Sequence, residues 1–197
     1  MANYFTSGQF DLYKTTSLST ARSDPASYYT ADRKITVFIS HKHEDLNDLM
    51  GVIGFLEKQY NVRCYIDGLD QTMPKVTSAE TAEKLKNRIK TCNKFILLAT
   101  TKAIESKWCN WELGYGDSQK YKSDSLAIFP IKMKSELSTD FKGNEYMDIY
   151  PTVVYRDGTT KYADGTVIEK AYYVRTKNQK GSYTLTPLYQ WLRSKNL

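Results

Sequence analysis

The residues best suited to chemistry lie in one segment, 95–117, which reads FILLATTKAIESKWCNWELGYGD. Its apolar run at 95–99 is short enough to be a buried strand, and a helix is expected after a short polar turn. Trp108, Glu112 and Tyr115 recur at the spacing of one helical face, which places a carboxylate beside aromatic rings. Open α/β sheets bind ligands at the carboxyl ends of their strands, so Glu112 is the first candidate for a functional group. Taken alone, it also fits a solvated helix residue.

Alternating strands and amphipathic helices surround this segment. The polar loop SHKHED leads from a first strand, ending at Ser40, into a helix that Asn61 ends. The pattern Thr77-Ser78-Ala79-Glu80 fits a capping box and predicts a further helix to about Lys90. This alternation predicts an α/β fold with a parallel, doubly wound sheet. The expected strands are 35–39, 62–66, 95–99 and 126–131.

The rest of the chain differs in character from this alternating region. Residues 1–33 show no sustained period and are expected to form an irregular amino-terminal extension that either packs on the domain or stays mobile. After about residue 134, Asp157-Gly158 and Asp164-Gly165 predict one or two β-hairpins, and a closing helix is expected after Pro187. A single domain over 34–197 is therefore expected, with its core at about 34–133 and additions at about 134–197.

Composition narrows the range of partners. The 197 residues have no apolar run of membrane-spanning length and no apolar signal core, which predicts a cytoplasmic protein with no membrane partner. The net charge of +6 suits a phosphate-bearing ligand, although a solvated basic surface is the simpler explanation. Lysines and arginines are spread along the whole chain without a dense basic block, so nucleic acid is not an expected partner.

No metal site is expected. The three cysteines are odd in number and lie in apolar segments without CxxC spacing, which is typical of small core residues in a reducing compartment. Two histidines separated by one residue on a polar loop are more typical of a polar surface than of a ligand pair. These residues are Cys64, Cys92, Cys109, His41 and His43.

Several of these segments, in this order, resemble the TIR domain (Toll/interleukin-1 receptor/resistance protein) in its bacterial form. The resemblance covers about residues 34–133 and implies a flavodoxin-like fold, with a central parallel sheet flanked by helices. Trp108-x-x-x-Glu112 resembles the WxxxE element of NAD-cleaving TIR proteins, including those of Thoeris antiphage defence. The matching segments are VFISHKHED, CYID, DGLDQTMP, KFILLAT and SKWCNWELG.

The resemblance also implies roles for individual residues. Glu112 matches the catalytic glutamate of the enzymatic members, and the end of the first strand with its loop matches the border of the nucleotide site. The loop 67–76, which contains Pro74, matches a mobile loop that gates the site and shapes self-association. Aromatic side chains near Glu112 offer flat walls for nicotinamide or adenine. The expected substrate-binding residues are Phe38, Ser40, His41, Lys42, Asp67, Trp108, Trp111 and Tyr115.

One glutamate is sufficient for the implied reaction. Cleavage of the nicotinamide–ribose bond passes through an oxocarbenium-like transition state, which a nearby carboxylate stabilises. Nicotinamide leaves a pyridinium cation as a neutral molecule, so a second carboxylate is not needed as an acid. With NAD as substrate and no cofactor, the expected products are nicotinamide and either ADP-ribose or a cyclic or conjugated ADP-ribose.

The sequence therefore leaves two alternative functions. The first is an NAD glycohydrolase or cyclase in antiphage defence, active on self-association, whose nucleotide messenger reaches a separate effector protein. The second is a non-catalytic TIR interaction module that acts by homotypic assembly. A phosphoacceptor receiver on a similar fold is disfavoured, because the first strand ends in Ser-His-Lys-His where an acidic Mg²⁺ cluster would be needed.

Overall fold

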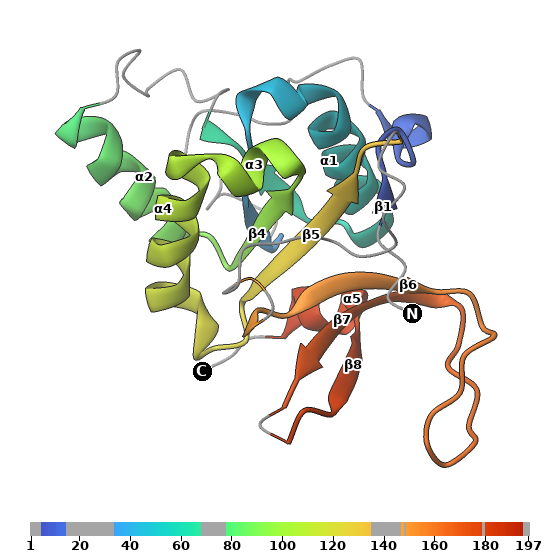
Figure 1. Cartoon of the computed structure of the whole chain (residues 1–197). Coiled ribbons are helices and arrows are strands. Elements are labelled where there is room, and N and C mark those ends of the chain that lie inside the picture. Colours follow the sequence, from blue (N-terminus) through green and yellow to red (C-terminus); the bar gives the residue numbers. More distant parts are fainter. Residues whose placement is uncertain are drawn as a thin grey trace.

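The sheet of the computed structural model runs in the order β3-β2-β4-β5-β6-β7-β8, and β1 pairs with β5 beside this path (Figure 1). The structure describes residues 5–14, 34–67, 78–134, 147, 149–178 and 180–194. The predicted gating loop 67–76 lies outside these residues apart from Asp67. The strands are β1 Phe5–Thr6, β2 Thr36–Ser40, β3 Arg63–Tyr65, β4 Lys94–Ala99, β5 Leu126–Lys132, β6 Thr152–Arg156, β7 Ala171–Lys177 and β8 Tyr183–Pro187.

Helices cover both faces of the parallel part of the sheet. Val37 and Ile39 of β2 pack with the cluster that contains α1 and α5, whereas Phe38 packs with α2, α3 and α4. Successive strand residues point to opposite faces, so a run that is apolar throughout indicates a strand buried on both sides. The predicted α/β fold with a central parallel sheet is confirmed. The helices are α1 Leu46–Tyr60, α2 Ala79–Thr91, α3 Thr101–Glu105, α4 Lys107–Gly116 and α5 Leu188–Arg193.

The helix boundaries follow from local capping. Asn61 caps the carboxyl end of α1 in the left-handed conformation, at φ 54°. This is the residue at which the sequence predicts the end of the helix. Helix α2 begins after Ser78, whose hydroxyl accepts a hydrogen bond from the backbone N–H of Thr81. The predicted pairing of Thr77 with Glu80 is therefore wrong by one residue, and the box is closed by the Thr81 hydroxyl rather than by a glutamate.

The described part of the amino-terminal segment belongs to the sheet and the core. β1 pairs in parallel with Ile131 and Lys132 of β5, and Phe5 packs its ring against Phe10 and Phe129. Of the two outcomes expected for the extension, residues 5–14 pack on the domain, but they are not irregular throughout, because they include β1 and a helical turn at Asp11–Tyr13. A two-residue strand and a single helical turn are too short to show a period, which is why the sequence pattern missed them.

The sheet is not parallel throughout. β7 and β8 run antiparallel to their neighbours, so the predicted doubly wound parallel sheet holds only from β3 to β6. Both Asp-Gly pairs lie in the arm between β6 and β7, which extends away from the body (Figure 1). The predicted closing helix after Pro187 is confirmed as α5, which buries Leu188, Trp191 and Leu192.

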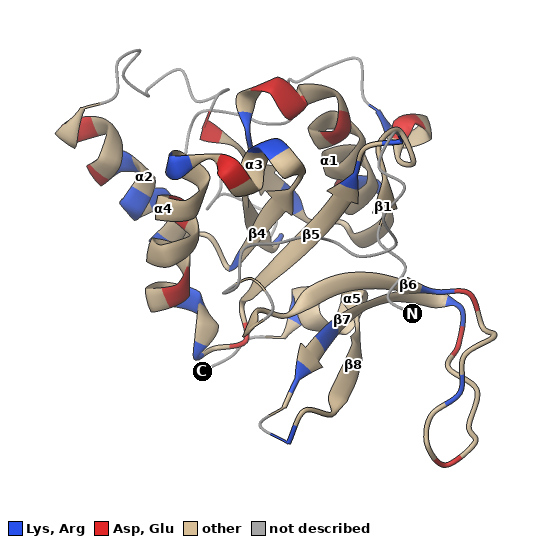
Figure 2. Cartoon of the chain, in the orientation of Figure 1, with Lys and Arg blue, Asp and Glu red and all other residues tan. Residues whose placement is uncertain are grey.

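Charged residues are dispersed over these elements. Figure 2 shows Lys and Arg interspersed with Asp and Glu along α1, α2, α3 and the β6–β7 arm, whereas β7 and α5 carry only basic residues. Among the helices of the described segments, none has the length and apolar character that a membrane crossing requires.

Candidate active site

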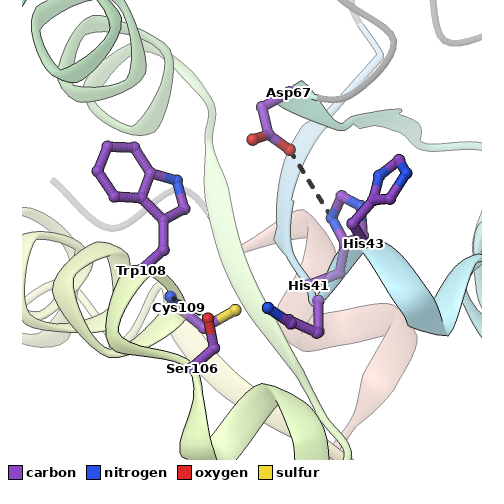
Figure 3. Close-up of a pocket in the computed structure, with 7 residues that line it drawn as sticks. His41, His43, Asp67, Ser106, Trp108 and Cys109 are labelled. Carbon is purple, nitrogen blue, oxygen red and sulfur yellow. Dashed lines mark hydrogen bonds and ion pairs between the residues drawn. The ribbon is translucent and has the colours of Figure 1, made fainter. Parts of the chain in front are cut away.

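A pocket of about 160 Å³ lies beyond the carboxyl ends of β2 and β3, against the first turn of α4 (Figure 3). This is the edge at which open α/β sheets bind ligands. Each wall comes from a different part of the chain: the loop after β2, the residue where the chain leaves β3, and α4. The residues that line the pocket are His41, Lys42, His43, Asp67, Ser106, Trp108 and Cys109.

Two caps set the direction of α4. Thr100 caps α3 by accepting a hydrogen bond from Ala103 N–H, and Ser106 caps α4 by accepting one from Cys109 N–H. The Thr100 hydroxyl also donates to the Asp45 carboxylate, which ties the end of β4 to the loop after β2. The chain therefore restarts as α4 at a fixed place beside β2.

Glu112 is a buried carboxyl group with one hydroxyl partner. The residue is 2% exposed, and Ser40, which is 1% exposed, donates a hydrogen bond of 2.5 Å from its hydroxyl group to Oε2. Burial raises the pKa of Glu112 well above its usual value, the negative charge of Asp67 raises it further, and the Ser40 hydrogen bond lowers it. The alternative of a solvated helix residue is wrong, because α4 presents this face to β2 rather than to solvent.

Cys109 stands between this carboxyl group and the pocket. Ser40 and Glu112 are not among the described residues that line the cavity, whereas Cys109, one helical turn before Glu112, is. Its thiol lies in hydrogen-bond contact with the Ser40 and Ser106 side chains, and burial raises its pKa to about 11. Cys109 is therefore a neutral side chain that touches both the cavity and the hydroxyl group holding Glu112.

His41 forms the opposite wall. Its side chain is 3% exposed, and Nδ1 lies 3.3 Å from the carbonyl oxygen of Ile39 and 3.9 Å from Oδ1 of Asp67. Figure 3 shows Asp67 facing this ring across the cavity edge. Burial lowers the pKa of His41, and the nearby Asp67 charge opposes part of this effect. The imidazole is consequently neutral at physiological pH.

The aromatic residues of α4 form a stack that only begins at the pocket. Trp108 and Trp111 have ring centroids 5.0 Å apart, and Trp111 and Tyr115 follow at 6.2 Å, each pair nearly parallel. Lys86 of α2 lies over the last two rings, with its Nζ 5.8 and 5.9 Å from their centroids. The stack therefore leads from the pocket towards α2.

The structure gathers some of the predicted substrate-binding residues and not others. His41, Lys42, Asp67 and Trp108 line the pocket, and Ser40 lies beside Glu112. Phe38 is fully buried between Tyr65 and Phe95. Phe38, Trp111 and Tyr115 are not among the described residues that line the pocket.

Three lining residues were missed from the sequence: His43, Ser106 and Cys109. Ser106 carried a usable signal, because a serine directly before a helix is a typical cap. Cys109 carried one as well, since it precedes Glu112 by three residues and so shares its helical face. Within the described residues, no group of three or more His, Cys, Asp or Glu side chains is placed to hold a metal ion.

Comparisons with known proteins cover this region. The TIR domain family matches residues 37–161, which include the pocket and Glu112. The "Probable 3' cyclic ADP-D-ribose synthase ThsB'" of Bacillus cereus (strain MSX-D12) is 31% identical over 143 residues. That match spans 71% of this chain and 66% of the relative, slightly under two thirds of its length. Among solved structures, a prokaryotic SEFIR domain aligns with a TM-score of 0.43 and 15% identity, covering 62% of this chain and 82% of that one.

Proposed function

The chain belongs to the TIR domain family, and from this premise we propose that it cleaves the nicotinamide–ribose bond of NAD and forms a cyclic ADP-ribose. The observation that carries the proposal is the buried Glu112 carboxyl group, held by Ser40 beside a pocket at the carboxyl edge of the sheet. The Bacillus cereus relative, named "Probable 3' cyclic ADP-D-ribose synthase ThsB'", supports the cyclic product. Hydrolysis to ADP-ribose is the competing outcome for the same intermediate.

Glu112 supplies the negative charge for this reaction. The transition state carries positive charge on the ribose, and a carboxylate in a buried site stabilises it more strongly than one in water. Ser40 fixes Oε2, while Oε1 makes no hydrogen bond with any residue that the structure describes. In the proposal, Oε1 is the atom that faces the ribose.

The protonation state of Glu112 then depends on the substrate. Its raised pKa disfavours the carboxylate in the empty site, because burial removes the solvation of the charge. NAD brings a pyridinium cation, and an opposite charge within a few ångströms lowers the pKa of a carboxyl group. Binding of the substrate itself therefore favours the ionised form that the reaction needs.

The described pocket suits one end of the dinucleotide. Its volume of about 160 Å³ is below the roughly 300–1,000 Å³ of typical ligand sites. We place the nicotinamide ring against Trp108 and the neighbouring phosphate near Lys42, with Cys109 shifting aside to expose Glu112. The adenosine end extends past the described walls, and self-association completes the site there.

The proposal extends to the role in the cell. A cyclic ADP-ribose released from this site is a messenger for a separate effector protein in antiphage defence. The resemblance to NAD-cleaving TIR proteins supports this role, and the enzymatic proposal does not depend on it.

The test is incubation of purified protein with NAD at high protein concentration. Chromatography and mass spectrometry follow nicotinamide and the ADP-ribose products. The expected result is release of nicotinamide together with a product of the mass of cyclic ADP-ribose, which is one water lighter than ADP-ribose. No nicotinamide release across a range of protein concentrations that drives assembly would contradict the proposal and favour the non-catalytic interaction module.

A further inference from the structure

We propose that the Cys109 side chain is a gate between the pocket and Glu112, and that the strength with which this gate is held closed sets the apparent affinity for NAD. This inference rests on the NAD cleavage proposed above and adds a residue that controls access to the same site. In the empty site the thiol is hydrogen-bonded and the gate is closed. Substrate binding turns the side chain aside, with no covalent change at the sulfur.

Cys109 lies at the boundary between the cavity and the carboxyl group. It lines the pocket although the residue is only 1% exposed, whereas Ser40 and Glu112 are not among the described residues that line it. It precedes Glu112 by three residues in α4, so both side chains lie on one face of the helix. Figure 3 shows its sulfur pointing away from α4, towards the side of the cavity that His41 forms. A substrate that enters from the pocket therefore meets Cys109 before Glu112.

Two hydroxyl groups hold the thiol in the closed position. The thiol is in hydrogen-bond contact with the Ser40 and Ser106 side chains. Ser40 already donates its single hydroxyl proton to Glu112, so the thiol is the donor towards Ser40. The Ser106 oxygen accepts the Cys109 backbone N–H, which leaves its own proton to point at the sulfur. A thiol is a weak donor and a weak acceptor, so the gate is closed but easily opened.

A gate of this kind changes the affinity for the substrate rather than the chemistry. A ligand that binds only when the gate is open has its apparent affinity reduced by the fraction of molecules that are open. Once the substrate is bound, the gate is open in every variant and the step at Glu112 is the same. The KM for NAD is therefore expected to change with the side chain at position 109, while kcat stays nearly constant.

Two small substitutions are expected to act in opposite directions. Cys109→Ala has no group that bonds either serine, so the gate stays open and the KM for NAD is expected to fall about 3-fold. Cys109→Ser keeps the shape, but its hydroxyl group bonds Ser40 and Ser106 more strongly than the thiol does, so KM is expected to rise about 3-fold. A side chain that only filled space would move KM in the same direction in both variants, because Ala and Ser are both smaller than Cys.

Cys92 provides the matched control. It is a buried cysteine of the same apolar cluster as Cys109, but it is not among the described residues that line the pocket. The same two substitutions at this position carry the cost of changing a buried thiol without touching the cavity. Cys92→Ala and Cys92→Ser are expected to keep KM and kcat within about 2-fold of the wild type. Circular dichroism shows whether each variant is folded.

The native thiol gives a second measurement that needs no substitution. Methyl methanethiosulfonate reacts with a cysteine at mildly alkaline pH: the thiol loses its proton, its sulfur bonds to the methylthio sulfur, and methanesulfinate leaves. At Cys109 the added group fixes the gate closed. Nicotinamide release by the wild type is expected to fall at least about 10-fold in step with the label at Cys109, which peptide mass spectrometry locates. Release by Cys109→Ala is expected to survive the reagent, although Cys64 and Cys92 are still present.

The outcomes separate this inference from the proposed function. A wild type that releases no nicotinamide overturns NAD cleavage, and the gate falls with it. Release with a KM that is unchanged in Cys109→Ala and Cys109→Ser, or that moves in the same direction in both, overturns the gate alone. A change confined to kcat does the same, because it would make Cys109 a support for Glu112. If the variants do not fold, full release by a wild type labelled at Cys109, or no label at Cys109, overturns the gate.

Discussion

The Ser40 hydroxyl donates a hydrogen bond of 2.5 Å to the Glu112 carboxyl group, across 72 residues of sequence and with both side chains almost fully buried. Ser40 closes β2 and Glu112 lies in the middle of α4. A buried carboxyl group is costly unless a partner satisfies it, so this pair orients Glu112 and lowers its pKa against the larger effect of burial.

Ser40→Ala is expected to slow NAD cleavage and to move its acidic limb to higher pH. The Ser40 hydrogen bond lowers the pKa of Glu112, so its loss raises that pKa and leaves less carboxylate at neutral pH. We expect about 10-fold slower nicotinamide release at pH 7 from a pH–rate profile. Ser118→Ala is the control, because Ser118 is exposed and, among the described residues, bonds only the Tyr115 carbonyl and the Gln119 amide. An unshifted acidic limb in Ser40→Ala would show that the hydrogen bond does not set the ionisation of Glu112.

Asp67→Asn is expected to shift the same limb in the opposite direction. The negative charge of Asp67 raises the pKa of Glu112, so its removal lowers that pKa and extends activity to lower pH. The variant keeps the shape of the side chain, and the shift is measured relative to the maximum of each profile so that altered substrate affinity does not interfere. A shift to higher pH would contradict the assigned electrostatic effect.

Trp108→Ala and Tyr115→Ala are expected to differ, although both residues belong to one aromatic stack. Trp108 lines the pocket, whereas Tyr115 lies at the far end near Lys86. The loss of an aromatic wall weakens ligand binding, so we expect the KM for NAD to rise about 10-fold in Trp108→Ala and less than 2-fold in Tyr115→Ala. Equal increases in KM in the two variants would contradict binding of the substrate in the described pocket.

Two glycine variants test the docking of the amino-terminal segment on α1. A Cβ at Gly54 would lie 2.0 Å from the Tyr13 carbonyl oxygen, whereas a Cβ at Gly114 would have no atom of the described residues within 4 Å. We expect Gly54→Ala to lower the free energy of unfolding by about 1–3 kcal/mol. Gly114→Ala is expected to raise it by up to about 1 kcal/mol through helix propensity. Urea denaturation measures both, and an unaffected Gly54→Ala would mean that residues 5–14 do not dock there in solution.

Much of the fold was accessible from the sequence because its signals are local. The apolar run of β4 and the amphipathic pattern of α1 each predict their own element, and their alternation predicts a parallel sheet. β1 was not accessible in this way. Its two residues are too few to show a period. They pair with Ile131 and Lys132 of β5, which lie far from them in the sequence.

The candidate site, like the fold, was predictable from the sequence only in part. Glu112 was found because its motif lies within one helix, and His41 and Lys42 because they follow a recognisable strand. The Ser40–Glu112 hydrogen bond and the intervening Cys109 depend on how α4 is placed against β2. That placement comes from tertiary packing and from the caps at Thr100 and Ser106, so it required the structure.

The raised pKa of Glu112 also makes the stability of the fold depend on pH. Because folding raises the pKa of Glu112, the folded state binds its proton more tightly, and this contribution to stability falls as the pH rises from about 4.3 towards the raised value. Glu112→Gln retains an acceptor for Ser40 but has no charge to bury. It is therefore expected to melt at the same or a higher temperature than the wild type at neutral pH, with the difference increasing over that pH range.

The most direct measurement is nicotinamide release from NAD by Glu112→Gln beside the wild type, at equal and high protein concentration. The account predicts that release falls at least about 100-fold, because the carboxylate no longer stabilises the transition state, while the variant stays folded and at least as stable. Release by a folded Glu112→Gln within a few-fold of the wild-type rate would contradict the central claim that Glu112 is the catalytic residue.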